Sequence, residues 1–309
     1  MNDNMRIRSN GVRCLGWLLL GLIPVFIMEA VNQLVCLAGI GGRMVWLIAS
    51  GVQGTYYDLL VKASEFLSEH TMELTIVFQL VTLLIIFLWY WFAFAREKKL
   101  YKPSSVFTVK HSVIKIVILA FAASRVTSLV LILEGVLFPK AMENYSQIME
   151  TSEAGAGWFV IFISSIIFAP IVEELVFRGL TTEILKRTGW RFGIVNMIQA
   201  LLFGMVHRNL IQGIYAFLLG LLLGYVCEKY GSLRASMVLH GCINIGGSYL
   251  SQLLGMVFKD GNTWSYAVLA LGMLGVVLMF LMVRLIQKEV EGKRQIEGAG
   301  YGTEPGKDE

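Results

Sequence analysis

Long runs of apolar residues alternate with short polar segments along most of the chain. A run of about 18 or more apolar residues is long enough to cross a bilayer as a helix. Such runs lie near residues 12–39, 74–95, 112–138, 157–177, 192–208, 210–227, 235–257 and 264–286. The pattern therefore predicts an all-α, polytopic membrane bundle of about eight transmembrane helices. The division between the fifth and sixth runs is the weakest, because little more than Arg208 and Asn209 separates them.

The basic residues between these runs predict the orientation of the chain. Lys and Arg concentrate before the first run, after the last run and in every second loop between them. Cytoplasmic loops carry this excess, so we expect both termini in the cytoplasm and the protein in the plasma membrane. We expect an N-terminal two-helix region at 1–111, a membrane core at 112–288 and a disordered cytoplasmic tail at 289–309, which is rich in Gly and charge.

Composition supports the membrane interpretation and excludes other classes. Hydrophobic residues make up 56% of the 309 residues, charged residues 16%, and the mean hydropathy is +0.67. Soluble enzymes and disordered chains are more polar, and secreted disulfide scaffolds contain a larger share of cysteine than the four in this chain. The net charge of +4 follows from the basic loops, so we expect no nucleic-acid partner. No C-x-x-C pair is present to suggest a thiolate zinc site.

Ionisable residues within the apolar runs are few, and each is a candidate for function because burying it in hydrocarbon is costly. Four of them lie outside any recognisable motif: Glu29, Lys115, Arg125 and Glu134. We expect these four to form helix-packing pairs or interface anchors, and we expect Arg125 to pair with a carboxylate on a neighbouring helix.

Two adjacent glutamates end the fourth run. Glu173 and Glu174 diverge by about 100° on a helix, so they cannot share one role. Arg178 follows Glu174 by one turn, and this spacing predicts an ion pair between them that leaves Glu173 facing another direction. The alternative is a charged helix end whose side chains extend to the membrane interface.

Two histidines lie at or within later runs. Phe203 precedes His207 by one helical turn and is expected to pack against its imidazole. His240 and Asn244 are also one turn apart, so both project from one helix face. Each histidine alone is more typical of an ordinary surface or core residue. Together with Glu173 they supply a base, oxyanion donors and metal ligands, which water-mediated hydrolysis requires.

The ordered motifs E-E-x-x-x-R, F-x-x-x-H and H-x-x-x-N resemble the CAAX protease and bacteriocin-processing family of intramembrane proteases. This family, also called the Abi family, includes the type II CAAX prenyl endopeptidases. The resemblance spans roughly residues 158–250 and leaves the other helices unassigned.

The resemblance implies a multi-pass endopeptidase that acts on a membrane-associated or lipidated peptide. Glu173 would be the general base, His207 would orient the water or bind a metal, and His240 with Asn244 would stabilise the oxyanion. Glu174, Arg178 and Phe203 would support this site. A zinc ion held by Glu173, His207 and His240 and a metal-free glutamate mechanism both stay open, because the H-E-x-x-H pairing is missing.

A shared site requires Glu173, His207 and His240 to reach a similar depth, in the cytoplasmic half of the bilayer. This holds if the helix of Glu173 continues past Arg178 toward Lys186. If it ended at Arg178, His207 would emerge on the opposite side from Glu173. Two other functions are compatible with the pattern: an idle member of the same fold that binds a partner, for example as an immunity protein, and a proton-coupled transporter.

Overall fold

The computed structural model of the protein describes residues 3–95, 109–153, 157–257 and 260–300. These residues are almost entirely helical, and no strand occurs among them, which confirms the all-α prediction. The helices that lie outside the segment 158–186 are α1 (Asp3–Ala49), α2 (Tyr56–Glu69), α3 (Thr71–Tyr90), α4 (Val109–Leu137), α5 (Pro139–Glu153), α9 (Phe192–Met205), α10 (Leu210–Tyr230), α11 (Leu233–Gly247), α12 (Tyr249–Val257) and α13 (Gly261–Gly300), with a short π-helix η1 (Trp91–Ala95) after α3.

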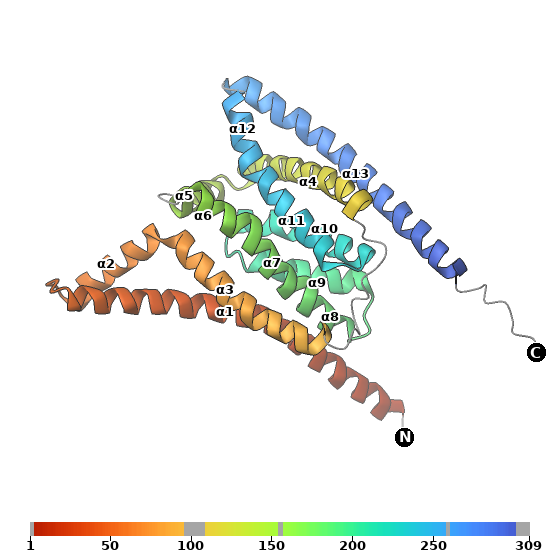
Figure 1. Ribbon diagram of the computed structural model, residues 1–309, viewed down its shortest axis with the longest axis horizontal. Coiled ribbons are helices and arrows are strands. Elements are labelled where there is room, and N and C mark those ends of the chain that lie inside the picture. The colour runs from red at the N-terminus through yellow and green to blue at the C-terminus, as the bar shows by residue number, and fades with distance from the viewer. Residues whose placement is uncertain (1–2, 96–108, 154–156, 258–259, 301–309) are drawn as a thin grey trace, which may run out of the picture. The chain divides into compact units, whose positions relative to one another are not determined.

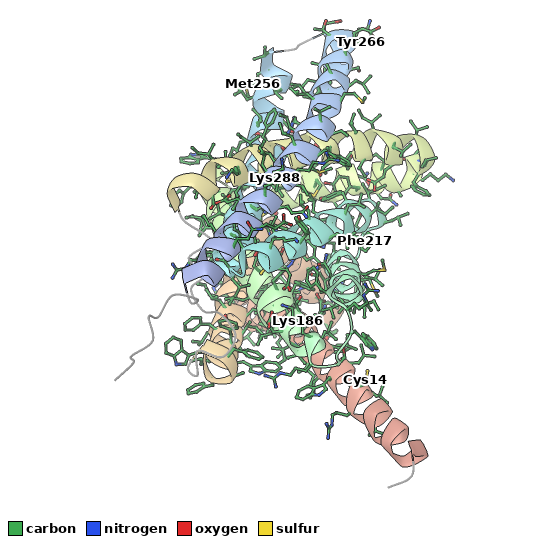
Figure 2. All side chains as sticks on the ribbon, turned by 90° about the vertical axis from the view of Figure 1, so that its right-hand side faces the viewer. Cys14, Lys186, Phe217, Met256, Tyr266 and Lys288 are labelled. Carbon is green, nitrogen blue, oxygen red and sulfur yellow. The ribbon has the colours of Figure 1, made fainter. Side chains whose placement is uncertain are left out.

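Six helical segments among the described residues are long and apolar enough to cross a membrane. They are Gly11–Ala49, Thr71–Phe94, Ser112–Leu137, Trp158–Lys186, Leu210–Tyr230 and Gly261–Lys293. The side chains along them are mostly carbon (Figure 2), and many large apolar residues are exposed on their surfaces, as a lipid-facing helix requires. The chain is therefore a multi-pass membrane protein.

The expected count of eight spans is not confirmed. The fifth expected span is the 14-residue helix α9, which ends at Met205, so that His207 lies just beyond it. The seventh is divided at Ser248 into α11 and α12. Toward its C-terminus the chain is more helical than expected. α13 continues through Glu289 to Gly300, whereas residues 301–309 of the expected tail lie outside the described residues.

The chain forms two compact units. One combines Met1–Arg96 with Leu131–Leu221, and the other combines Glu97–Val130 with Leu222–Glu309. The division falls within α4 and within α10, so each of these helices contributes to both units.

In the first unit, α1 and α3 run beside each other and are joined through α2 (Figure 1). α2 begins with a capping box in which the Thr55 side chain and the Asp58 carboxylate each accept a hydrogen bond from the other residue's backbone N–H. α1 also packs against the segment 175–186. Gly21 permits this approach, because a Cβ atom there would lie 2.6 Å from the Leu185 side chain.

A single helical rod carries the E-E-x-x-x-R motif in the first unit. It consists of α6 (Trp158–Phe162), η2 (Ile163–Phe168), α7 (Ala169–Glu174), η3 (Leu175–Thr181) and α8 (Thr182–Lys186), where η marks π-helical turns. Pro170 follows η2, and its ring is incompatible with a regular α-helical bond to the preceding turn. The rod reaches Lys186, as a shared site requires. π-Helical turns of this kind often lie at functional sites, and here they flank both glutamates.

The second unit is held together by two polar clusters. Glu289 on α13 accepts hydrogen bonds from Ser112, Lys115, Tyr230 and Lys293, so the expected packing role of Lys115 is confirmed. The prediction that Arg125 pairs with a carboxylate on a neighbouring helix is wrong. The buried Arg125 guanidinium donates to the Gly246 carbonyl and to the Ser251 hydroxyl, where α11 ends and α12 begins.

Candidate active site

The two adjacent glutamates face different surroundings, as their spacing predicts. Glu174 is fully buried, and its Oε1 lies 2.8 Å from Nη1 of the equally buried Arg178. Glu173 instead lines a cavity in the first unit. The predicted ion pair is confirmed, and the alternative of a charged helix end at the interface is excluded for Arg178, whose side chain has no exposed surface.

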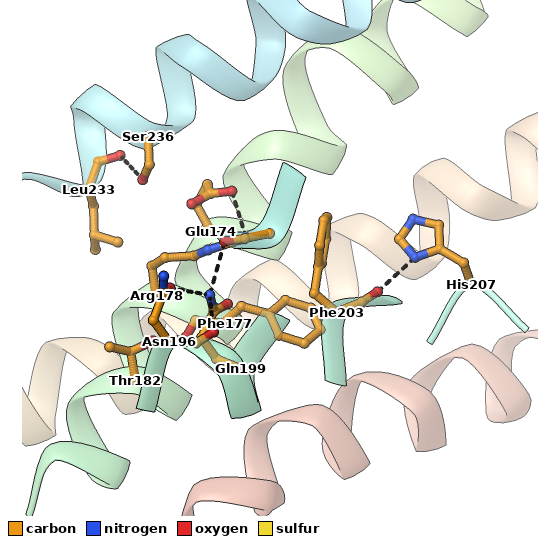
Figure 3. A network of polar contacts seen from close by, with 11 residues as sticks. Glu174, Phe177, Arg178, Thr182, Asn196, Gln199, Phe203, His207, Leu233 and Ser236 are labelled. Atoms are coloured by element: carbon orange, nitrogen blue, oxygen red, sulfur yellow. Dashed lines mark hydrogen bonds and ion pairs between the residues drawn. The ribbon is translucent and has the colours of Figure 1, made fainter. Parts of the chain in front are cut away.

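The Arg178 guanidinium connects three helices within the first unit (Figure 3). Its Nη2 donates to the Gly220 carbonyl of α10 at 3.1 Å, and the same carbonyl accepts a hydrogen bond from Gln199 of α9 at 3.0 Å. The guanidinium carbon lies 4.7 Å from the centre of the Phe203 ring. Glu174, Arg178 and Phe203 therefore fix the rod against α9 and α10, and their supporting role in catalysis stays a prediction.

A cavity of about 140 Å³ lies beside this network. Ordered water in proteins needs several polar partners and a space of at least one probe sphere, and this cavity provides both. It is lined by residues of α1 and α3, by residues of α7 and by the segment after α9: Met28, Glu29, Asn32, Phe78, Gln79, Ala169, Val172, Glu173, Val206 and His207. The structure thus brings Glu173 and His207 together.

The His207 ring is oriented by the residue one turn before it (Figure 3). Its Nδ1 lies 2.8 Å from the Phe203 carbonyl oxygen, and its ring contacts the Phe203 ring edge to face at 5.2 Å between centroids. A carbonyl oxygen only accepts, so Nδ1 carries the proton in this bond. In the neutral imidazole, Nε2 is then the acceptor. The predicted packing of Phe203 against His207 is confirmed.

His240 and Asn244 lie one turn apart on α11, in the second unit. His240 is buried, with 6% of its surface exposed. The next turn of α11 is its last, and the Ser248 N–H closes it by donating to the Asn244 carbonyl. That His240 and Asn244 act in one site with Glu173 and His207 stays a prediction.

Of the residues expected to bind zinc, Glu173 and His207 belong to the first unit and His240 to the second. Across the described ranges, no group of three or more His, Cys, Asp or Glu side chains is arranged to hold an ion. The His207 tautomer resembles that of metal-bound histidines, which usually donate their other N–H to a carbonyl or carboxylate. Zinc dependence stays a prediction.

Sequence reasoning missed one wall of the cavity. Gln79 donates from Nε2 to the Ser164 carbonyl at 3.2 Å and places α3 against the π-helical turn before Glu173. Glu29 and Asn32, which sequence placed in an apolar span without a site role, face the same cavity from α1. The sequence does show that these polar side chains lie within apolar runs, which marks them as candidates for function. It does not show which helix each of them faces.

A comparison with protein families finds a match over residues 155–246 to the family described as type II CAAX prenyl endopeptidase Rce1-like. This segment contains every residue of the three motifs, from Glu173 to Asn244, and excludes α1, α3 and α13. The match confirms the resemblance to the CAAX protease family. No curated protein and no solved structure was found to match the chain.

Proposed function

We propose that this membrane protein is an intramembrane endopeptidase that hydrolyses a membrane-associated or lipidated peptide with water activated by Glu173. The observation that carries the proposal is that Glu173 and His207, which both belong to the segment that matches the CAAX prenyl endopeptidases, line the same cavity. Such a cavity admits water next to a carboxylate and an imidazole, which are the most common general bases and acids.

The reaction would begin when the Glu173 carboxylate accepts a proton from water. The water oxygen then forms a bond to the peptide carbonyl carbon, and the carbonyl electrons move to its oxygen. His207 would hold the attacking water through Nε2, since its Nδ1–H is used by the Phe203 carbonyl. His240 and Asn244 are proposed as donors to the oxyanion.

The intermediate then collapses to a carboxylic acid as the carbon–nitrogen bond breaks. The leaving nitrogen takes the proton that Glu173 accepted, so the protein ends the cycle in its starting state. Each oxyanion donor contributes on the order of 10²–10³-fold in such reactions. The role of Glu173 is one that glutamine cannot perform, because an amide does not accept a proton from water.

The test uses purified full-length protein in detergent with a library of membrane peptides that includes prenylated ones. We expect cleavage by the wild type and a loss on the order of 10²–10⁴-fold in Glu173→Gln. Glu65→Gln, on the exposed face of α2, is the matched control and should retain full activity. A near wild-type rate in Glu173→Gln would refute the general-base role.

Two further arms separate the open alternatives. Activity that is lost with a chelator and restored by zinc would support a metal centre, whereas activity that survives chelation would support water activation by the side chains alone. Peptide binding without any product from the wild type would favour the idle, partner-binding member of the fold.

A further inference from the structure

The residue that follows His207 has a backbone conformation that L-residues rarely adopt. Arg208 has φ of 54°, and it is the one non-glycine residue with positive φ in the described ranges. This left-handed region is unfavourable for a residue with a Cβ atom, and such outliers persist where the surrounding structure holds them. Arg208 closes the turn after α9, where its N–H donates to the Met205 carbonyl at 3.1 Å.

Two residues of α1, one helical turn apart, hold the Arg208 side chain. Its Nη2 forms an ion pair with the Glu29 carboxylate. The Gln33 amide, with its oxygen turned toward the guanidinium, accepts from Nη1 at 2.9 Å and from Nη2 at 3.1 Å. All three residues belong to the first compact unit. We call this arrangement the α1 clamp.

The clamp lies at the edge of the cavity. Glu29 lines the cavity together with His207, and 56% of the Arg208 side chain is exposed. An ion pair this exposed contributes little to folding, because water and salt screen it. Its effect is better explained by the conformation it holds, since Arg208 is bonded directly to His207.

We propose that Glu29 and Gln33 are positioning residues that fix the His207 imidazole in the cavity by holding Arg208 in the left-handed conformation. Without the clamp, Arg208 can relax to a negative φ, which reorients the chain at the end of α9 and moves the imidazole. The proposal rests on the proposed function. It assigns a catalytic contribution to α1, which lies outside the segment 155–246.

A double-mutant cycle separates this role from direct contact with substrate. Glu29→Gln should lower kcat roughly 10- to 100-fold with little change in KM, because small displacements of catalytic groups have effects of this size. Arg208→Gly should retain most activity, since glycine adopts positive φ without a side-chain penalty. Adding Glu29→Gln to Arg208→Gly should then cause no further loss.

Gln33→Ala should lower kcat in the same way as Glu29→Gln but by a smaller factor. Arg208→Ala should lose activity, because alanine cannot contact Glu29 and Gln33 and does not adopt positive φ as readily as glycine. The proposal is refuted if Glu29→Gln lowers kcat equally in the Arg208→Gly background, or if it raises KM alone. Either result would assign Glu29 to substrate contact. Full activity in Glu29→Gln would also overturn it.

A spectroscopic readout keeps the test valid even if no peptide is cleaved. The chain has four histidines, so ¹⁵N-histidine spectra in detergent can be assigned with His207→Gln. We expect one set of His207 ring signals in the wild type and in Arg208→Gly, and shifted or broadened signals in Glu29→Gln. Unchanged signals in Glu29→Gln would overturn the clamp, whereas missing turnover in the wild type would count only against the protease function.

Discussion

Replacing Arg178 by methionine should strongly destabilise the protein. Methionine keeps an unbranched side chain of comparable length in the same space but removes the guanidinium. Glu174, which has no exposed surface, then loses the charged partner whose Nη1 lies 2.8 Å from its Oε1. The Gly220 carbonyl loses one donor but keeps Gln199 at 3.0 Å.

The size of the effect follows from the burial of both partners. Removing one member of a buried ion pair typically costs about 3–5 kcal/mol, because the remaining charge is left in a poor solvent. A Coulomb energy of about 4 kcal/mol for charges ~4 Å apart at an effective dielectric of ~20 agrees with this range. Since each kcal/mol shifts Tm by roughly 2–4 °C in domains of ~150–250 residues, we expect a decrease on the order of 10 °C.

The assay is thermal unfolding of the detergent-solubilised protein, followed by tryptophan fluorescence at a fixed heating rate, because unfolding of large proteins is often irreversible. Lys186→Met is the matched control. Lys186 pairs with Glu183 on the same rod at 2.8 Å, and the Lys186 side chain is 31% exposed whereas that of Glu183 is 4% exposed. Because water still reaches this pair from the lysine side, Lys186→Met should lower Tm by less than Arg178→Met does.

The double variant Glu174→Leu with Arg178→Met tests the mechanism of the loss. Replacing both members of a buried pair by apolar residues is often neutral or stabilising, so the double variant should recover much of the stability that Arg178→Met loses. If Arg178→Met unfolds at the same temperature as Lys186→Met, the pair is solvated and the reasoning from burial is wrong. A double variant no more stable than Arg178→Met would show that Arg178 stabilises the protein mainly through Gly220 and Phe203.

Two further predictions concern the second unit and the orientation of the chain. Arg125→Leu should lower stability by about 1.5–3 kcal/mol, the usual contribution of a hydrogen bond to a charged group, because the Gly246 carbonyl loses the guanidinium donor and retains the longer hydrogen bond from the Ser251 hydroxyl at 3.3 Å. An unchanged Tm would show that the burial cost of the guanidinium cancels the contribution of its hydrogen bonds. In a background without the four native cysteines, a membrane-impermeant maleimide applied to intact cells should label Gln53→Cys and not Trp190→Cys, and the reverse pattern would refute the cytoplasmic placement of both termini.

Contacts between residues four apart in the chain could be predicted from sequence because local helical geometry determines them. The Glu174–Arg178 ion pair and the Phe203–His207 contact both follow from a separation of four residues. Neither required knowledge of any other helix. The divergence of Glu173 from Glu174 follows from the same geometry.

Contacts between helices could not be predicted, since apolar runs show which segments are buried but not which of them meet. Arg125 was expected to pair with a carboxylate, yet it donates a hydrogen bond to the Gly246 carbonyl at the end of α11. Every helix has such carbonyls at its C-terminus, so the sequence does not indicate which of them a buried arginine will contact. The count of eight spans is likewise not confirmed. The run 235–257 was expected to form one span, but the helix divides at Ser248, next to Gly246 and Gly247.

The cavity itself depends on helices that the motifs do not reveal. Within the segment 155–246, α7 and the end of α9 supply Glu173 and His207, but the facing wall comes from α1 and α3. That wall is present because α1 approaches the rod closely at Gly21, where a Cβ atom would meet Leu185. The matched segment alone would leave the Glu173 side of the rod uncovered. The residues that line the cavity from α1 and α3 are therefore ones whose identity the family motifs leave open, and among them Glu29 also forms an ion pair with Arg208, beside His207.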